Sequence, residues 1–392
     1  MRKSASTSLA LVLLLGLASA ASAACGSPPP PPPKAPEPTA ATVDMPAPPP
    51  PKVEEPKPEP PKPSLAELQA KALAAYWEAM NGHDAAKLGA LYADDAEWKM
   101  AGTPPTKGRA TIEAEVAKFF AFAPDSKLAP NLVLSKGDVT VIQYAITGTN
   151  KGDMGPIKPT NKPIGWQAMH IAWWTPEGKI REEHAYWDNG TMLSQMGLSP
   201  RKAPAIPTLA ASPQTVAASG SEAETKNVAL LGTMYGAMEK KSAADFLSLT
   251  TDTSEWIDNT QPAPSKGKAD AKKFFDNHMK AFPDAKMTVK ASWGIGDFVV
   301  TEAQMTGTNT GPLFGRPATK KAVTMDTADI VLLKDGKMVK GWSFANSMQV
   351  AEQLGLMPKH GGGKGHHEHG EHKGEHGKGG GKGAPKGGGK KK

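Results

Sequence analysis

Four residues close together in the chain have side chains that can take part in proton transfer: His170, His184, Tyr186 and Asp188. A carboxylate can remove a proton from a carbon next to a carbonyl group, and an imidazole or a phenol can stabilise the oxyanion that then develops. We therefore predict Asp188 as a general base, with His170, His184 or Tyr186 as the oxyanion stabiliser.

The segments that carry these residues, 166–174 and 179–187, are predicted to be two paired strands. The turn between them contains Pro176, Glu177 and Gly178. In a three-residue hairpin loop, Pro suits the first turn position and Gly the left-handed one. Because side chains alternate between the faces of a strand, this turn predicts which residues share a face. The predicted pairs on that face are His170 with His184, Trp166 with Asp188, and Trp174 with Ile180.

Spacing limits the chemistry of this face. His184 and Asp188 are four residues apart on one strand, roughly 13 Å, which is too far for a direct hydrogen bond. The same separation argues against one metal ion bound by His170, His184 and Asp188, because metal–ligand bonds are about 2 Å long. Tyr186 lies about 6.6 Å along the strand from Asp188, so these two side chains could contact one ligand.

Structural roles are the alternatives for the same residues. Asp188 ends a strand before a predicted helix, where an aspartate caps the helix well. The His170–His184 pair can be an ordinary contact between strands, and Trp174 is typical of a core. Catalysis and packing both remain open for these positions.

A second copy of the same plan follows in the chain. The motif at residues 195–198 (QMGL) recurs as QLGL at 353–356, and the TGTN of residues 147–150 recurs at 306–309. Such a repeat indicates two related domains. The predicted parts are a signal peptide (1–24), a lipidation site and Pro-rich stalk (25–63), domain 1 (64–200), a linker (201–220), domain 2 (221–358) and a tail (359–392).

Each domain is predicted to be α+β. In domain 1 a capping box, Ser64 to Glu67, begins the first helix, and Asp84 can cap the second. Helices come first and strands follow, which favours helices packed on an antiparallel meander. The remaining predicted elements are a helix over 111–122, strands over 128–134, 140–149, 166–174 and 179–187, and a closing helix over 191–196.

Domain 2 has an equivalent turn at Lys334, Asp335 and Gly336, which predicts that Ala328 faces Trp342 and that Thr324 faces Asn346. Where domain 1 has His184, Tyr186 and Asp188, this domain has aromatic and uncharged residues. Asparagine cannot act as a base at neutral pH, so we expect any chemistry in domain 1. The predicted ligand-binding residues of the two domains are Trp166, Trp174, Trp342, Phe344 and Asn346.

Several motifs of domain 1 together resemble the SnoaL-like polyketide cyclase family, within the superfamily of ketosteroid isomerase and nuclear transport factor. They are Tyr76 to Asn81 (YWEAMN), Asp94 to Trp98 (DDAEW), Lys107 to Arg109 (KGR), Pro176 to Ile180 (PEGKI), Tyr186 to Asp188 (YWD) and Leu193 to Leu198 (LSQMGL). The resemblance implies a curved antiparallel sheet wrapped around helices, with an apolar cavity inside the cone. It also implies that Asp188 stands where family cyclases have their general base. The superfamily includes isomerases, cyclases and simple binders, and its members often dimerise through the sheet.

The start of the chain predicts export. Arg2 and Lys3 precede an apolar run over residues 9–17, which is too short to span a membrane. Cys25, the only cysteine, follows small residues and resembles the lipidation site of bacterial lipoproteins, although Ser22 stands where that motif prefers Leu. We predict an envelope protein, anchored through Cys25 in the outer membrane, with plain secretion as the alternative.

The tail combines glycine, lysine and histidine. It contributes most of the formal net charge of +7, so the domains themselves are near neutral and carry no basic groove for nucleic acid. Histidine-rich segments bind divalent metals weakly, and lysine runs attract polyanions. A solvated extension is the third interpretation. The candidate metal ligands are His366, His367, His369 and His372.

Three functions remain open from the sequence, and none of them requires a cofactor. The chain can be an anchored module that binds a small apolar or aromatic molecule. It can be a cyclase or isomerase that works through Asp188 of domain 1. It can also be a structural adaptor, in which domains pair within one chain or between two chains.

Overall fold

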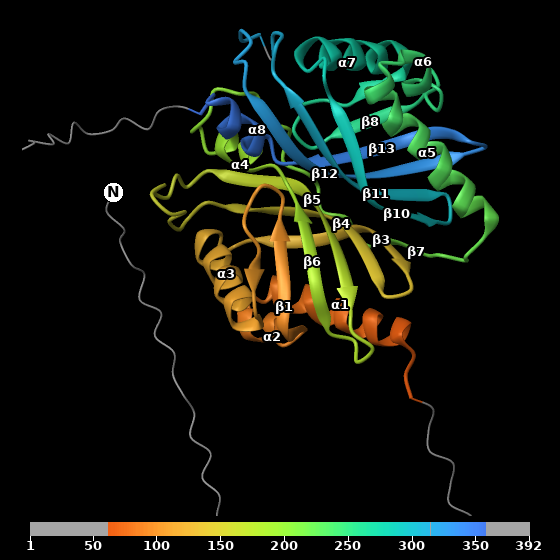
Figure 1. Ribbon diagram of the computed structural model, residues 1–392. Helices are drawn as coiled ribbons and strands as arrows, with labels where there is room; N and C mark the ends of the chain where they lie inside the picture. The colour runs from red at the N-terminus through yellow and green to blue at the C-terminus, as the bar shows by residue number, and fades with distance from the viewer. Residues whose placement is uncertain (1–61, 314, 358–392) are drawn as a thin grey trace, which may run out of the picture. The chain divides into compact units, whose positions relative to one another are not determined.

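The computed structural model describes residues 62–313 and 315–357 (Figure 1). The predicted signal peptide, Cys25, most of the Pro-rich stalk and the histidines of the tail lie outside these residues. Among the described helices, none is long and apolar enough to cross a membrane.

The helices of domain 1 lie close to where the sequence predicts them. The first begins at the predicted capping box: the Ser64 hydroxyl accepts from the Glu67 N–H at 3.3 Å, and the Glu67 carboxylate accepts from the Ser64 N–H at 2.7 Å. Asp84 caps the second through the Lys87 N–H. The four helices are α1 (Leu65–Asn81), α2 (Ala85–Gly89), α3 (Arg109–Phe122) and α4 (Asn189–Gln195).

Domain 1 contributes a mixed sheet rather than a purely antiparallel one. Its order is β2-β1-β6-β5-β4-β3-β7, in which β1 runs parallel to β6 and β7 runs parallel to β3. The last strand comes from the predicted linker, where no strand was expected. The strands are β1 (Tyr92–Met100), β2 (Thr106–Lys107), β3 (Lys127–Lys136), β4 (Val139–Thr149), β5 (Pro163–Trp174), β6 (Ile180–Tyr186) and β7 (Gln214–Ala217).

Domain 2 repeats this architecture with a sheet of order β10-β11-β12-β13-β8-β9. Its helices are α5 (Glu222–Lys240), α6 (Ala243–Phe246), α7 (Gly267–Ala281) and α8 (Ser347–Leu354). Its strands are β8 (Glu255–Asp258), β9 (Ser265–Lys266), β10 (Lys286–Ile295), β11 (Phe298–Thr308), β12 (Ala322–Lys334) and β13 (Lys337–Ala345). The α+β prediction is confirmed for both domains.

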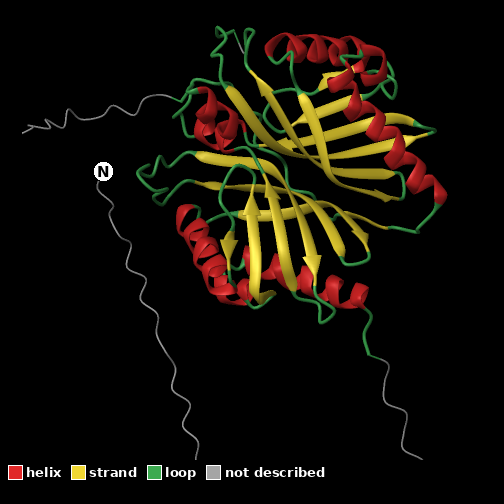
Figure 2. Cartoon of the chain, viewed as in Figure 1, coloured by secondary structure: helices red, strands yellow, loops and turns green. Residues whose placement is uncertain are grey.

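Each sheet has helices on one side, as Figure 2 shows. In domain 1 the helices and this side of the sheet bury one large apolar cluster, which we call the interior of domain 1. The opposite sides of both sheets contribute to a shared buried cluster, which includes Leu134, Val141 and Ile171 of domain 1 with Val300 and Ile330 of domain 2.

The predicted register of the β5–β6 hairpin is only partly correct. Gly178 has φ 76° and Trp174 pairs with Ile180, as the turn predicts. Beyond that pair a β-bulge adds Arg181 to β6, so His170 pairs with Ala185 and not with His184. One extra residue moves every following side chain to the other face. The prediction that His170, His184 and Tyr186 share a face is therefore wrong.

The register predicted for domain 2 is also wrong. Asp335 and Gly336 both have positive φ, at 51° and 70°, and they form a two-residue loop between Lys334 and Lys337. A bulge follows, and Ala328 pairs with Phe344 instead of Trp342. The face predicted to line a cavity, with Trp342 and Phe344, belongs to the cluster shared by the two sheets.

Candidate functional site

A group of polar side chains lies inside the apolar interior of domain 1. Tyr76 comes from α1, Tyr92 from β1, Tyr144 from β4, His170 from β5 and Glu183 from β6. All five are buried; Glu183 is 1% exposed and His170 is 5% exposed. We call this group the buried polar cluster.

His170 is the centre of the buried polar cluster. Its Nδ1 lies 2.9 Å from Glu183 Oε1, and its Nε2 lies 2.6 Å from the Tyr144 hydroxyl. Tyr92 donates to the other oxygen of Glu183, and the Tyr76 hydroxyl is 3.4 Å from Nδ1. A carboxylate only accepts, so a proton on Nδ1 donates to Glu183, and Nε2 accepts the Tyr144 proton when the ring is neutral.

The three tyrosines of the buried polar cluster act as hydrogen-bond donors at any physiological pH. Burial, followed by the nearby charge of Glu183, raises the pKa of Tyr76, Tyr92 and Tyr144 well above the ordinary value of 10.0. Ionised tyrosine is disfavoured both by the loss of water and by the neighbouring carboxylate. The cluster therefore combines phenol donors with one imidazole and one carboxylate.

Aromatic rings connect this cluster with the surface. Trp77, Trp98 and Trp187 are only partly buried and pack against the interior of domain 1. The Trp187 ring centroid is 6.3 Å from that of His170 and 5.9 Å from that of Trp98, and Trp77 is 5.5 Å from Tyr144. We call these three tryptophans the aromatic wall. Solvent reaches the aromatic wall, and the buried polar cluster lies directly behind it.

Domain 2 lacks this arrangement. Gly341 pairs with Trp256 just as Glu183 pairs with Trp98, so glycine occupies the position of the carboxylate. A Cβ atom on Gly341 would lie 2.1 Å from Cε3 of Trp256, which means that the indole covers the space a side chain would need. The carboxylate of the cluster thus has no counterpart in domain 2.

Asp329 of domain 2 takes the place of His170. Asp329 pairs with Thr301, and His170 pairs with Ile142. Each residue of the first pair lies 159 positions after its counterpart in the second pair. Tyr235 donates to Asp329 at 2.5 Å. Burial raises the pKa of Asp329 to about 6, against hydrogen bonds from Ser343 and Tyr235 that lower it.

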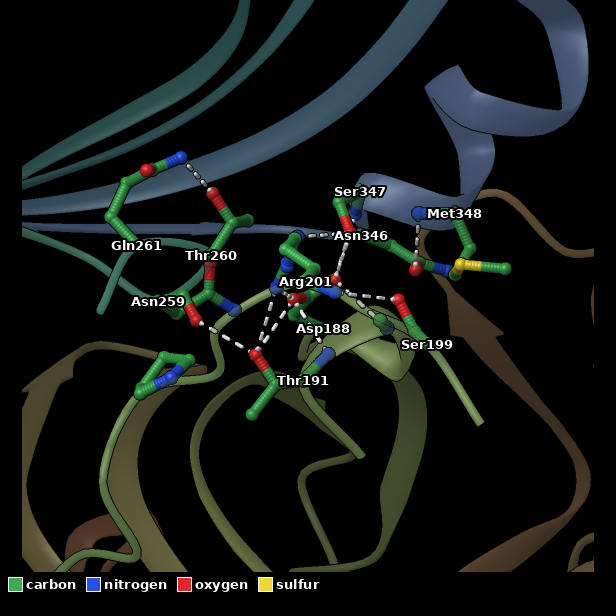
Figure 3. Close-up of polar contacts among 12 residues, drawn as sticks. Asp188, Thr191, Ser199, Arg201, Asn259, Thr260, Gln261, Asn346, Ser347 and Met348 are labelled. Carbon is green, nitrogen blue, oxygen red and sulfur yellow. Dashed lines mark hydrogen bonds and ion pairs between the residues drawn. The ribbon is translucent and has the colours of Figure 1, made fainter. Parts of the chain in front are cut away.

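Asp188 lies at the start of α4 and contacts both domains (Figure 3). Its carboxylate accepts from the Thr191 N–H at 2.9 Å and from the Ser347 N–H and hydroxyl of domain 2 at 3.0 and 2.6 Å. Arg201 is 2.5 Å away, and Asp188 is 1% exposed. This geometry favours the capping alternative, and a role as general base stays a prediction.

His184 and Tyr186 face the other domain. His184 Nδ1 is 2.5 Å from Glu302 of β11, its Nε2 is 2.9 Å from Glu182, and Tyr186 donates to Glu302. His184, Tyr186 and Glu302 border a cleft of about 460 Å³, lined by both domains. Burial lowers the pKa of His184, but the hydrogen bonds and charges of Glu302 and Glu182 raise it overall.

The predicted ligand-binding residues do not form one site. Trp166 and Trp174 lie in the interior of domain 1, where Trp174 Nε1 donates to Thr140 at 3.0 Å. Trp342 and Phe344 pack between the sheets. Asn346 caps α8 and donates to the Ala101 carbonyl at 3.2 Å. Within residues 62–313 and 315–357, no group of three or more His, Cys, Asp or Glu side chains is arranged to hold a metal ion.

Sequence reasoning missed four of the five residues of the buried polar cluster, and only His170 was predicted. Glu183 was missed because the bulge in β6 turns it inward, and nothing in the sequence marks a bulge. A compositional signal was present for the tyrosines. The chain has five tyrosines, and domain 1 contains Tyr76, Tyr92, Tyr144 and Tyr186.

Comparisons with known proteins address the family. No curated protein matches the chain. AclR of Streptomyces galilaeus is a similar solved structure, with 23% identity over 34% of this chain and 99% of its own, at a TM-score of 0.32. TsrD of Streptomyces laurentii has 19% identity over 35% of this chain and 98% of its own, at a TM-score of 0.32. A protein of ketosteroid isomerase-like fold from Catenulispora acidiphila has 22% identity over 34% of this chain and 98% of its own, at a TM-score of 0.29.

The sequence profile of the family described as SnoaL-like polyketide cyclase matches two segments, residues 70–196 and 230–354. These segments together make up more than half of the chain, and each contains most of the helices and strands of one repeat. The chain therefore belongs to the SnoaL-like polyketide cyclase family and contains its domain in tandem.

Proposed function

We propose that domain 1 binds a small molecule with an apolar or aromatic body, and that domain 2 supports domain 1. The observation that carries this proposal is the buried polar cluster behind the partly exposed aromatic wall. The ligand body packs on Trp77, Trp98 and Trp187, and a polar group of the ligand meets His170 or Tyr144.

The composition of the buried polar cluster favours a ligand over a purely structural role. Burying a carboxylate costs roughly several kcal/mol of hydration free energy. A protein retains such a group only where hydrogen bonds to its partners, or its function, compensate for that cost. An apolar core of similar volume would be at least as stable. In domain 2 the same fold forms with Gly341 in place of Glu183, so the fold does not need a carboxylate at this position, although domain 2 buries another carboxyl group, Asp329, at the position of His170.

The second candidate function is proton transfer, favoured by the bridge that His170 makes between Glu183 and Tyr144. If the Tyr144 hydroxyl turns to a ligand carbonyl, Nε2 of His170 is free to take a proton from the adjacent carbon. The proton moves to Nε2, the Glu183 carboxylate stabilises the imidazolium, and Tyr144 donates to the enolate oxygen.

Envelope anchoring belongs to the same proposal and rests on the sequence of residues 1–25. The basic start, the short apolar run and Cys25 support export followed by lipidation. Radiolabelled palmitate supplied to producing cells should label the full chain and not the Cys25→Ala variant. Equal labelling of both would contradict the anchor without affecting ligand binding.

Binding is tested with 2-naphthol, an aromatic alcohol, titrated into the full chain while tryptophan fluorescence is followed. Tyr144→Phe keeps the ring and removes the hydroxyl, so we expect about a ten-fold loss of affinity, the value of one good hydrogen bond. The matched control is Tyr235→Phe in domain 2, which should leave the affinity unchanged. Equal effects of the two variants, or no effect of Tyr144→Phe, would contradict binding in domain 1.

Proton transfer is tested with 2-tetralone, an aryl ketone with acidic hydrogens, in D₂O. Mass spectrometry should detect faster deuterium incorporation with the unsubstituted protein than without protein. Glu183→Gln should slow the exchange by about a hundred-fold or more. Binding of 2-naphthol without any exchange would leave the binding function and reject the enzymatic one.

A further inference from the structure

The indole N–H of Trp166 has no hydrogen-bond acceptor among the described residues, although the residue is only 6% exposed. Buried indole N–H groups usually find a partner, and a buried donor without one requires an explanation. The explanation can be a ligand that supplies the acceptor.

Trp166 lies on the same face of β5 as His170. The side chains of Trp166, Ala168 and His170 follow one another on that face, and the first two belong to the apolar cluster of the interior. Trp166 and His170 are four residues apart, roughly 13 Å along the strand. Alanine, with its small side chain, stands between the unpaired indole and the buried polar cluster.

Another tryptophan of the same strand shows that the fold can satisfy a buried indole here. Trp174 faces the same interior, and its Nε1 donates to the Thr140 hydroxyl at 3.0 Å. Beside Trp166, the paired residue on β4 is Ile146, which offers no side-chain acceptor. The unpaired donor therefore reflects the choice of residues at this position and not a general property of β5.

At the position that corresponds to Trp166, domain 2 has no such donor. Its counterpart of Trp166 is Met325, which pairs with Met305 just as Trp166 pairs with Ile146. The methionine side chain has no N–H group, so it needs no hydrogen-bond acceptor at this position. The unpaired donor and the buried polar cluster thus occur together in domain 1, and their two positions in domain 2 lack the corresponding groups.

We infer that Trp166 Nε1 donates to an acceptor oxygen of the molecule bound in domain 1. This inference rests on the proposed binding function and specifies its ligand class. The ligand is elongated, on the order of 10 Å, to connect two sites separated by four strand residues. It has an apolar middle beside Ala168, a polar group at His170 and a carbonyl or ether oxygen at Trp166.

A neutral acceptor fits this interior better than an anion. Glu183 is a carboxylate of the same interior, and the buried polar cluster contributes no lysine or arginine to balance a second negative charge. Like charges in a poorly solvated site repel each other strongly. A ketone or ether oxygen accepts the indole proton without that repulsion.

The test compares two fluorescent probes that differ only at the predicted acceptor. Both 6-acetyl-2-naphthol and 6-isopropenyl-2-naphthol have the hydroxyl for the buried polar cluster, and only the first has a carbonyl oxygen. The full chain should bind the acetyl probe more tightly, and Trp166→Phe should reduce that affinity about five-fold while the isopropenyl probe is unaffected. Trp174→Phe, which removes a satisfied N–H, should not change the ratio between the probes.

Thermal unfolding without probe provides a second readout. Both Trp→Phe changes leave a cavity, but only Trp174→Phe also removes a hydrogen bond, so Trp174→Phe should lower the Tm by a few degrees more than Trp166→Phe. A ratio between the probes that is the same in Trp166→Phe and in the unsubstituted protein would overturn the inference and leave the proposed function. Binding of neither probe to the unsubstituted protein would overturn both.

Discussion

Glu183 is both buried and hydrogen-bonded. It receives hydrogen bonds from His170 and Tyr92, and 1% of its surface is exposed. Removing the carboxylate leaves an imidazole and a phenol without an acceptor in an apolar interior. Each buried donor left without an acceptor lowers the stability of the folded state by roughly 1–3 kcal/mol.

We predict that Glu183→Ala lowers the free energy of unfolding by about 3 kcal/mol in urea denaturation. The control is Glu115→Ala, which removes a partly exposed ion pair with Lys118 and should cost less than about 0.5 kcal/mol. If the two substitutions destabilise the protein equally, the hydrogen bonds of the buried polar cluster do not contribute to stability.

Which single residues could be predicted depended on whether their role is local. The caps of Ser64 and Asp84 and the left-handed Gly178 follow from neighbouring residues, and all three are observed. His170 was selected by residue type, and its partners were not. Glu183 becomes a partner only through the packing of β6 against β1 and β5, which no short stretch of sequence specifies.

At the scale of elements, bulges account for the main errors of prediction. Arg181 in β6 and Val339 in β13 each add one residue after a turn, and each changes the register of the strand. The same bulge that removed His184 from the interior placed Glu183 there. Alternation of residue types predicts strands well, whereas the point at which alternation is interrupted depends on the tertiary fit.

Glu224 joins three elements at the start of domain 2. Its carboxylate accepts from the N–H groups of Ser219 and Gly220 in the linker and of Gly296 between β10 and β11, at 2.9, 2.9 and 2.8 Å. Burial opposes ionisation, but these backbone donors lower the pKa of Glu224 from 4.5 to about 2. The ionised carboxylate therefore stabilises the junction of linker, α5 and hairpin.

The sign of the pH effect follows from the lowered pKa. The stabilisation is complete above about pH 4.5, where the unfolded chain also ionises, and is lost as the pH falls through about 2. We predict that Glu224→Gln costs about 2 kcal/mol at pH 7 and progressively less below pH 4.5. Urea denaturation of both proteins from pH 7 to pH 2 measures this, and a constant difference across the range would contradict it.

At the scale of the whole described unit, the two sheets bury one apolar cluster between them. His184 is a titratable group that, like Asp188, bridges the domains; it lies between Glu302 of domain 2 and Glu182 of its own strand. Tyr186 also donates to Glu302, and Lys99 pairs with Glu182 at 2.6 Å. Protonated His184 neutralises part of this negative charge.

Because the pKa of His184 is raised in the folded protein, its stabilising effect is complete below pH 6.5, the pKa of the unfolded chain. The effect is lost as the pH rises through the higher pKa of the folded protein. We predict that His184→Gln destabilises the chain by about 1 kcal/mol at pH 6 and by less at pH 9. Thermal unfolding at both pH values compares the variants. A difference that grows with pH would show that the neutral imidazole is the stabilising form.

Domain 1 separated from domain 2 would expose one side of its sheet. Leu134, Val141 and Ile171 are each fully buried, and all belong to the cluster shared with domain 2. Apolar surface of this kind, once exposed, favours association with a second copy.

We predict that residues 62–217 expressed alone form a homodimer in sedimentation experiments, and that Ile171→Lys makes this fragment monomeric. In the full chain the same substitution should lower the Tm, because a lysine would then be buried between the sheets. A folded, monomeric fragment without the substitution would mean that domain 1 does not need its partner, and that the tandem arrangement has another cause than the burial of this face.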